Sequence, residues 1–219
     1  EWCVMAGALD DTICAIATPP GEGGIGIIRL SGPRAIDIAS RLVRLRSAAP
    51  LESVPSRVLS LAEVGARVTA VSPASGHPLD EALVAVMRRP HSYTGEDLIE
   101  INAHGSSFIL TEILHRLFEA GAEPAQPGEF TQRAFLNGKM DLSQAEAVAD
   151  LIHSTNAVQH RYAINQMKGG IRDQIARLRG KLVDFASLIE LELDFSEEDV
   201  EFADRTQLRA LVANIETYI

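Results

Sequence analysis

The chain has 219 residues, of which 46% are hydrophobic and 23% are charged, and its formal net charge at pH 7 is −10. These proportions are ordinary for a globular protein that can bury an apolar core in one large domain or two smaller ones. The acidic balance argues against a stand-alone nucleic-acid-binding domain, because such domains usually carry a basic face that neutralises phosphates.

The first elements of the chain follow a lead-in over residues 1–10 that has no clear pattern. Two strands are predicted over Thr12–Thr18 and Ile25–Leu30, because both segments are rich in isoleucine. The prolines and glycines of residues 19–24 predict a turn between them. A helix is then predicted from Ser31 to about Arg46, with a proline in its first turn.

The middle of the chain predicts more strands and a second helix. Arg57–Arg88 alternates between apolar and polar residues, which indicates two antiparallel strands joined by a turn over Ser72–Pro78. Another strand is predicted over Asp97–Ala103, and a helix over Ser106–Ala120 that ends at Gly121. This order of elements predicts an α+β domain with a mixed sheet.

The last part of the chain has a different character, because helix-forming residues dominate it. A long helical pattern runs over Ala157–Leu193 with an interruption at Gly169-Gly170, and another begins near Asp204 and continues to the last residue. We therefore expect an α+β domain over residues 11–138 and an all-α region over residues 139–219.

A glycine-rich segment between the first two predicted strands, residues 21–26, matches the pattern GxGxxG. A dinucleotide-binding site of this kind needs a helix after the glycines, so that backbone amides can hold a pyrophosphate. Here the apolar residues 27–30 predict a strand instead. The segment is better interpreted as a turn where the backbone approaches something closely, and both a ligand and another chain segment remain possible.

Signals for GTP, metal and membrane binding are missing from the sequence. There is no GxxxxGK[ST] phosphate loop, and residues 137–141 resemble the guanine-binding NKxD with the wrong spacing, so we expect no GTP binding by this chain. Cys3 and Cys14 have no zinc-binding spacing, and Cys14 is predicted to be buried in an apolar run. No segment approaches the roughly 20 apolar residues of a membrane span, and we expect a cytoplasmic protein.

Three charged residues stand in apolar or tightly turned surroundings: Arg29 and Glu100 in predicted strands, and Lys139 after a predicted short helix over Phe130–Asn137. Taken singly, each fits a solvated or ion-paired side chain. A buried glutamate would need a partner, because an unpaired buried carboxylate is costly. His104 ends a predicted strand, and it fits a ligand contact, a general base or a hydrogen-bonded structural histidine.

Three blocks of sequence together resemble one known family. Residues 11–32 contain ATPPG, GGIGI and RLSG; residues 92–105 contain SYTGED, Glu100 and HG; residues 127–152 contain PGEFT, RAFLNGK and QAEAVADLI. In this order they resemble the tRNA-modification GTPases of the MnmE (TrmE) family, over their N-terminal folate-binding domain and part of their helical domain. The GTPase domain that this family inserts into its helical domain is absent from the chain.

The resemblance implies a tetrahydrofolate-binding domain, similar in fold to the folate-dependent aminomethyltransferase of glycine cleavage, that also forms a homodimer. It further implies that the complete protein hydrolyses GTP with Mg²⁺ and K⁺ in the absent domain. With the flavoprotein MnmG (GidA), such a protein installs an aminomethyl-type group at C5 of the tRNA wobble uridine. The folate, as its 5-formyl or methylene form, supplies the one-carbon unit.

Carried over by motif, the folate contacts fall on Arg29, Glu100 and Lys139. A carboxylate such as Glu100 can accept the amino group and the ring N–H of a pterin together. Arg29 or Lys139 would then meet the anionic glutamate tail. Further candidate folate contacts are Gly23, Gly24, Gly26 and His104. We expect neither a catalytic residue nor a metal ligand in this chain.

Two other functions compete with this interpretation. One is a free-standing folate-dependent aminomethyltransferase, against which the start of a helical domain argues. The other is a purely structural dimerisation scaffold without a working folate pocket. Both alternatives share the predicted fold, so they differ from the first hypothesis only in what the chain binds and transfers.

Overall fold

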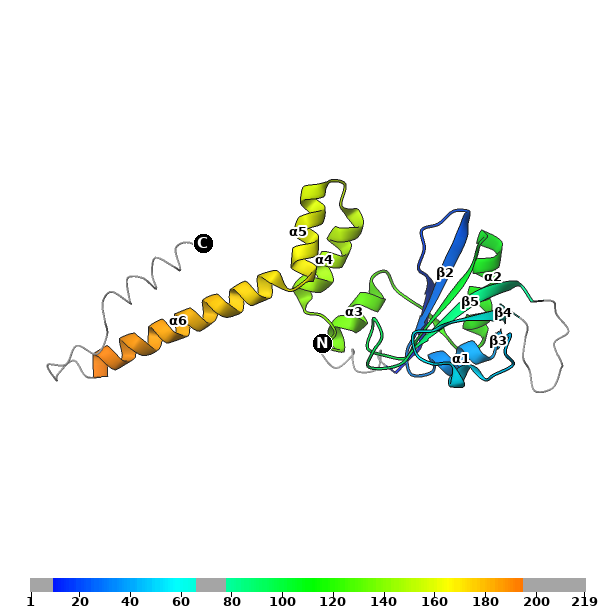
Figure 1. The fold of residues 1–219 in the computed structure, drawn as a ribbon, viewed down its shortest axis with the longest axis horizontal. Coiled ribbons are helices and arrows are strands. Elements are labelled where there is room, and N and C mark those ends of the chain that lie inside the picture. The colour runs from blue at the N-terminus through cyan, green and yellow to red at the C-terminus, as the bar shows by residue number, and fades with distance from the viewer. Residues whose placement is uncertain (1–9, 66–77, 195–219) are drawn as a thin grey trace. The chain divides into compact units, whose positions relative to one another are not determined.

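The computed structural model describes residues 10–65 and 78–194, which fall into two compact units, Glu1–Asp141 and Leu142–Ile219. The first unit combines a sheet with helices, and the described part of the second is helical (Figure 1). The predicted α+β domain followed by an all-α region is therefore confirmed in class.

A seven-stranded sheet with the order β3-β4-β5-β6-β2-β1-β7 forms the centre of the first unit. Its strands are β1 (Ile13–Ile16), β2 (Gly23–Ser31), β3 (Val43–Leu45), β4 (Leu59–Val64), β5 (Asp80–Met87), β6 (Leu98–Gly105) and β7 (Glu123–Pro124). Neighbouring strands are antiparallel except β1 and β7, which are parallel, so the sheet is mixed as predicted.

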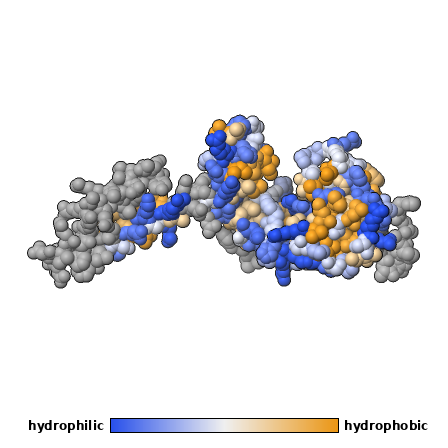
Figure 2. Space-filling model, in the orientation of Figure 1, coloured by the Kyte–Doolittle hydropathy of each residue, from blue (hydrophilic) through white to orange (hydrophobic). Residues whose placement is uncertain are grey.

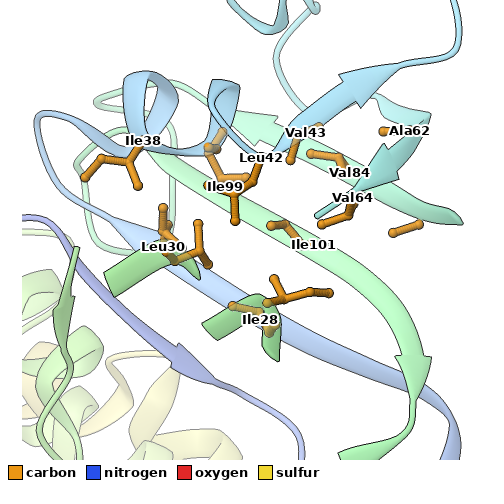
Figure 3. Packing of buried hydrophobic residues seen from close by; sticks show 14 of the residues in the cluster. Ile28, Leu30, Ile38, Leu42, Val43, Ala62, Val64, Val84, Ile99 and Ile101 are labelled. Carbon is orange, nitrogen blue, oxygen red and sulfur yellow. The ribbon is translucent and has the colours of Figure 1, made fainter. Parts of the chain in front are cut away.

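One face of the sheet carries the hydrophobic core. Two helices, α1 (Ala35–Ser40) and α2 (Ser107–Glu119), supply side chains that cluster with those of the strands. Ile28 of β2 and Ile101 of β6 are fully buried there, as is Ile38 of α1 (Figure 3). Burial of an isoleucine of this kind contributes roughly 1.5–3 kcal/mol relative to an exposed position.

The opposite face of the sheet, here called the open face, carries the alternate residues of the same strands. On β2 and β6 these residues include Arg29 and Glu100, each about one-quarter exposed in its side chain. On β4 and β5 they include Leu61 and Leu83, which are 38% and 43% exposed. The open face is therefore polar near β2 and apolar near β4.

The predicted helix over Ser31–Arg46 is wrong at both ends. Ser31 belongs to β2, helix α1 begins only at Ala35, and it ends at Ser40. Val43–Leu45 forms the edge strand β3 instead, because Val43 and Leu45 are buried while the residue between them is exposed. This period of two, together with antiparallel pairing to β4, favours a strand over a helix.

The other predicted elements of the first unit differ from the structure only in their bounds, and two short elements were not predicted. Helix α3 (Glu129–Leu136) follows the predicted position closely, and a short 3₁₀ helix over Leu51–Ser53 and strand β7 were not predicted. The predicted turn over Ser72–Pro78, apart from Pro78, and the predicted helix from Asp204 lie outside the described residues.

The second unit contains α4 (Leu142–His153), α5 (Ala157–Met167) and α6 (Gly170–Asp194). Side-chain amides join the first two helices: Gln144 donates to the Met167 carbonyl at 2.8 Å, and Gln166 donates to the Ser143 carbonyl at 3.1 Å. The predicted interruption at Gly169-Gly170 separates α5 from α6. Among the described residues, no helix is both long and apolar enough to cross a membrane.

Candidate functional site

Arg29 and Glu100 lie directly opposite each other on the antiparallel strands β2 and β6. Arg29 donates to Glu100 Oε1 from Nε at 2.9 Å and from Nη2 at 2.7 Å. Each side chain is about one-quarter exposed, 26% for Arg29 and 23% for Glu100. The structure therefore brings two of the predicted folate residues into a charge-neutral pair on the open face, where solvent or a ligand can reach them.

Two aromatic rings lie near the guanidinium of this pair. The Arg29 guanidinium carbon lies 5.3 Å from the centre of the Tyr93 ring and 5.6 Å from the centre of the Phe130 ring. Both distances are within the range of a cation–π contact. Sequence reasoning placed Tyr93 and Phe130 within family blocks but gave them no role, because their common partner is remote in the sequence.

Lys139, the third predicted folate residue, lies against the segment of residues 90–97, here called the site loop. Its ammonium donates to the carbonyl of Pro90 at 2.9 Å. A Cβ atom on Gly95 would lie only 3.2 Å from Lys139 Cγ, so the loop and the lysine stem pack closely. Lys139 is thus linked to Arg29 through the site loop, which also carries Tyr93.

The site loop is held by hydrogen bonds on two sides. Asn137 donates from its side chain to the Thr94 carbonyl at 2.8 Å. On the other side, Ser31 of β2 donates to Glu96 Oε2 at 2.7 Å and shares a 2.6 Å hydrogen bond with the Thr94 hydroxyl. Because Thr94 is fully buried, the loop has a fixed path between β2 and the end of α3.

Arg133 of α3 lies at the centre of a buried ionic network, with only 2% of its side chain exposed. It donates to Glu129 Oε1 at 2.8 Å, to Asp11 Oδ1 at 2.5 Å and to Glu96 Oε1 at 3.5 Å. Burial lowers the pKa of Arg133, but the hydrogen bonds to Glu129 and Asp11 and the charge of Glu96 outweigh it and raise the pKa above its ordinary value. Of these contacts, only the one with Glu129 has a signal in the sequence, because residues four apart on a helix lie side by side.

His104 lies on the open face too, but away from the Arg29–Glu100 pair. It is four residues from Glu100 along β6, or about 13 Å at the usual rise of a strand. Asp80 accepts hydrogen bonds from the His104 backbone and from ring Nδ1, both at 2.7 Å. An ionised Asp80 favours the tautomer with hydrogen on Nδ1, so Nε2 is the available acceptor.

The three candidate glycines of β2 have different surroundings. A Cβ on Gly26 would collide with the Leu110 side chain on the helix-covered face, so packing against another chain segment accounts for glycine there. A Cβ on Gly24 would meet nothing within 4 Å, and one on Gly23 only a backbone oxygen at 3.8 Å. Gly23 and Gly24 therefore leave space that a ligand can occupy, whereas Gly26 does not.

A polar cavity of about 400 Å³ borders the site loop. Its lining residues are Asp10, Pro33, Arg89, Gly95, Glu96, Asp97 and Asn137. Within the described ranges no three His, Cys, Asp or Glu residues are grouped so that they could hold a metal ion.

Comparison with known families matches the chain in two adjoining parts. Residues 12–139 match the family model of the GTP-binding protein TrmE N-terminus. Residues 142–219 match the model of the MnmE helical domain. The two matches meet within three residues of the boundary between the compact units, which lies between Asp141 and Leu142.

Curated relatives agree with these matches. The chain is 54% identical over 216 residues to a tRNA modification GTPase MnmE of Bacteroides thetaiotaomicron, which covers 95% of this chain and 43% of the relative. It is 51% identical over 209 residues to the protein of that name from Cytophaga hutchinsonii, with the same coverage, 95% and 43%. For Parabacteroides distasonis the identity is 52% over 210 residues, covering 95% and 44%. The chain therefore spans less than half the length of these relatives.

Proposed function

The chain belongs to the MnmE (TrmE) family of tRNA modification GTPases, and we propose that residues 11–138 form its tetrahydrofolate-binding and dimerisation domain. Residues 139–219 are then the first part of the helical domain. In the complete protein, another domain hydrolyses GTP with Mg²⁺ and K⁺. Together with the flavoprotein MnmG, that protein adds an aminomethyl-type group to C5 of the tRNA wobble uridine in the cytoplasm.

The observation that carries the folate proposal is the Arg29–Glu100 pair, whose guanidinium also contacts two aromatic rings. Arg29 uses only Oε1 of Glu100 in the two hydrogen bonds described, and a carboxylate has lone pairs for further donors. A pterin presents two adjacent N–H donors that suit such a carboxylate. Tyr93 and Phe130, whose rings contact Arg29, the partner of Glu100, offer flat apolar surface on which a flat heterocycle can stack.

Lys139 supports the same assignment through its charge. A folate carries an anionic glutamate tail, and an ammonium attracts it without requiring a fixed bidentate geometry. Since Arg29 is already paired with Glu100, Lys139 is the more available cation for the tail. His104, about 13 Å from Glu100 along β6 by strand rise, and the open positions Gly23 and Gly24 remain candidate contacts of an extended ligand.

The role of this chain in the reaction is to hold the one-carbon folate, as its 5-formyl or methylene form. We assign no catalytic residue within it, and transfer of the one-carbon unit takes place with the flavoprotein and the tRNA. The relatives are named tRNA modification GTPases, which favours this role over a free-standing aminomethyltransferase and over a scaffold without a ligand.

The open face of the sheet supports homodimerisation. Leu59, Leu61 and Leu83 are 59%, 38% and 43% exposed on neighbouring strands β4 and β5. Figure 2 shows hydrophobic residues gathered over this unit. Apolar patches of this kind commonly mark protein–protein interfaces. We propose that a second copy of the chain covers this patch.

Titration calorimetry with 5-formyltetrahydrofolate tests the folate site. We expect saturable binding by the wild-type chain and a loss of affinity of about tenfold or more, or ~1.4 kcal/mol, in the Arg29→Ala, Lys139→Ala double variant. Arg46→Ala is a matched control, because Arg46 pairs with Glu81 at 3.7 Å and is 70% exposed. Equal affinity in the double variant and the wild type would contradict the assignment. Transfer of the formyl group by the isolated chain would favour the transferase instead.

A further inference from the structure

Arg133 joins three segments that are distant in the sequence. Its guanidinium contacts Asp11 before β1, Glu96 in the site loop and Glu129 in the first turn of α3. It also donates to the Asp11 carbonyl at 3.1 Å. With 2% of its side chain exposed, Arg133 is shielded from solvent, unlike the quarter-exposed Arg29.

The segments that Arg133 joins are those that surround Arg29. The site loop carries Tyr93, and α3 carries Phe130, and both rings contact the Arg29 guanidinium. The hydroxyl of Tyr93 is also hydrogen-bonded at 2.8 Å to Thr131, the residue after Phe130. Lys139 follows α3 and rests on the site loop. A shift of α3 relative to the loop would therefore displace Phe130 and Lys139 from their places beside Tyr93 and Arg29.

We propose that Arg133 is a positioning residue that fixes α3 to the site loop and so pre-organises the groups around Arg29 for the folate. This inference rests on the folate-binding function proposed above. Without the network, the ligand itself must immobilise the aromatic side chains and the loop, and that ordering reduces its affinity. Three carboxylates around one guanidinium also make the contact geometry specific, because a guanidinium presents its donors in a planar fork and an ammonium does not.

The test variant is Arg133→Lys in the full chain. It keeps the positive charge but removes the planar set of guanidinium N–H donors. Calorimetry with 5-formyltetrahydrofolate is expected to show affinity reduced about tenfold, the loss for a ligand that must order two aromatic side chains. Hydrogen exchange followed by mass spectrometry, without ligand, is expected to rise within residues 90–97 and 129–139 and to stay unchanged in β5 and β6. A merely stabilising role would instead raise exchange throughout the sheet and leave the affinity of the folded fraction intact.

Arg116→Lys is the matched control. Arg116 of α2 also donates two hydrogen bonds to the glutamate four residues earlier, Glu112, and one to the carbonyl of Gly65. Unlike Arg133, it lies on the helix that covers the other face of the sheet. We expect wild-type folate affinity in this variant. A loss equal to that of Arg133→Lys would overturn the positioning role, because a partly exposed arginine paired on the helix-covered face would then have the same effect.

Asn137→Ala is a second probe that keeps every charge of the network. It removes only the hydrogen bond from Asn137 to the Thr94 carbonyl, so it loosens the same junction should Arg133→Lys fail to fold. Weaker folate binding with increased exchange in the site loop supports the proposal, and increased exchange with unchanged affinity overturns it. A wild-type chain that does not bind folate contradicts the folate site itself, whereas wild-type affinity in Arg133→Lys contradicts only the positioning role.

Discussion

Arg29 and Glu100 are expected to contribute little to stability, because their pair is partly exposed. Ion pairs in contact with solvent typically contribute about 0–1 kcal/mol, since water competes with each partner. With side-chain exposures of 26% and 23%, this pair is only partly exposed, so we expect its contribution near the upper end of that range. The pair can therefore rearrange when a ligand arrives without a large loss of folding free energy.

A double-mutant cycle measures this directly. We expect Arg29→Met and Glu100→Gln to show a coupling of about 1 kcal/mol or less in the free energy of unfolding, measured by urea denaturation. The same two variants are expected to weaken folate binding. A coupling of several kcal/mol would mean that the pair is primarily a structural ion pair.

Cys14 of β1 gives a pH-dependent prediction. Burial raises the pKa of its thiol from 9.0 to about 12, because the apolar core disfavours the thiolate. The unfolded chain therefore releases this proton at lower pH than the native chain does. Stability from this group is complete below pH 9.0 and falls as the pH rises toward about 12, by up to about 1.4 kcal/mol per pH unit.

Chemical denaturation of the wild type and of Cys14→Ala across this pH range isolates the effect. The free energy of unfolding of the wild type is expected to decline more steeply than that of the variant. Since all other titrating groups are shared, the difference between the two slopes belongs to Cys14. Parallel curves would show that the thiol ionises equally in both states.

At the scale of elements, the pairing of β2 with β6 decides what each face of the sheet does. Arg29 lies opposite Glu100, while Ile28 lies opposite Ile101 on the other face. A slip of one residue would bring the charged pair into the core and expose the isoleucines. The hydrophobic core and the candidate site are therefore two consequences of a single strand register.

The glycines of β2 give a matched pair of variants. Gly26→Ala is expected to destabilise the fold by about 1–3 kcal/mol, because its Cβ collides with Leu110. In Gly24→Ala the added Cβ has no neighbouring atom within 4 Å, so the free energy of unfolding should change by about 0.5 kcal/mol or less. Thermal denaturation measures both. If Gly24 lies against the folate, its alanine variant alone loses affinity while keeping stability.

At the scale of the whole molecule, the candidate site belongs entirely to the first compact unit. The residues proposed to bind folate and the network around Arg133 all lie within Glu1–Asp141. A chain that ends at Asp141 is expected to unfold cooperatively and to bind 5-formyltetrahydrofolate within about threefold of the longer chain, a difference of ~0.7 kcal/mol. Urea denaturation and calorimetry check the two expectations, and a non-cooperative transition would show that the unit depends on the helical part.

Self-association tests the proposed use of the apolar part of the open face. Leu61→Asp and Leu83→Asp each place a charge on that patch, and we expect both to shift the chain toward monomer in sedimentation velocity experiments over a concentration series. Ile152→Asp is the control, because Ile152 is 74% exposed on α4, outside the patch. A wild-type chain that sediments only as a monomer would contradict the homodimer.

Several features of this protein followed from local sequence alone. Apolar periodicity was enough to predict the α+β unit and the helical part, and ordered motif blocks were enough to indicate the family, because both signals lie within short segments. The same blocks also selected Arg29, Glu100 and Lys139. Their selection as folate residues remains a prediction.

Only the tertiary structure decided how these residues meet. Arg29 reaches Glu100 across 71 positions of the chain, and Arg133 reaches Asp11 across 122. Val43–Leu45 became a strand because β4 was available to pair with it. Gly26 proved to be a packing position because Leu110 lies over it. Each of these outcomes depends on contacts between distant segments, and local periodicity contains no information about which distant segments will meet.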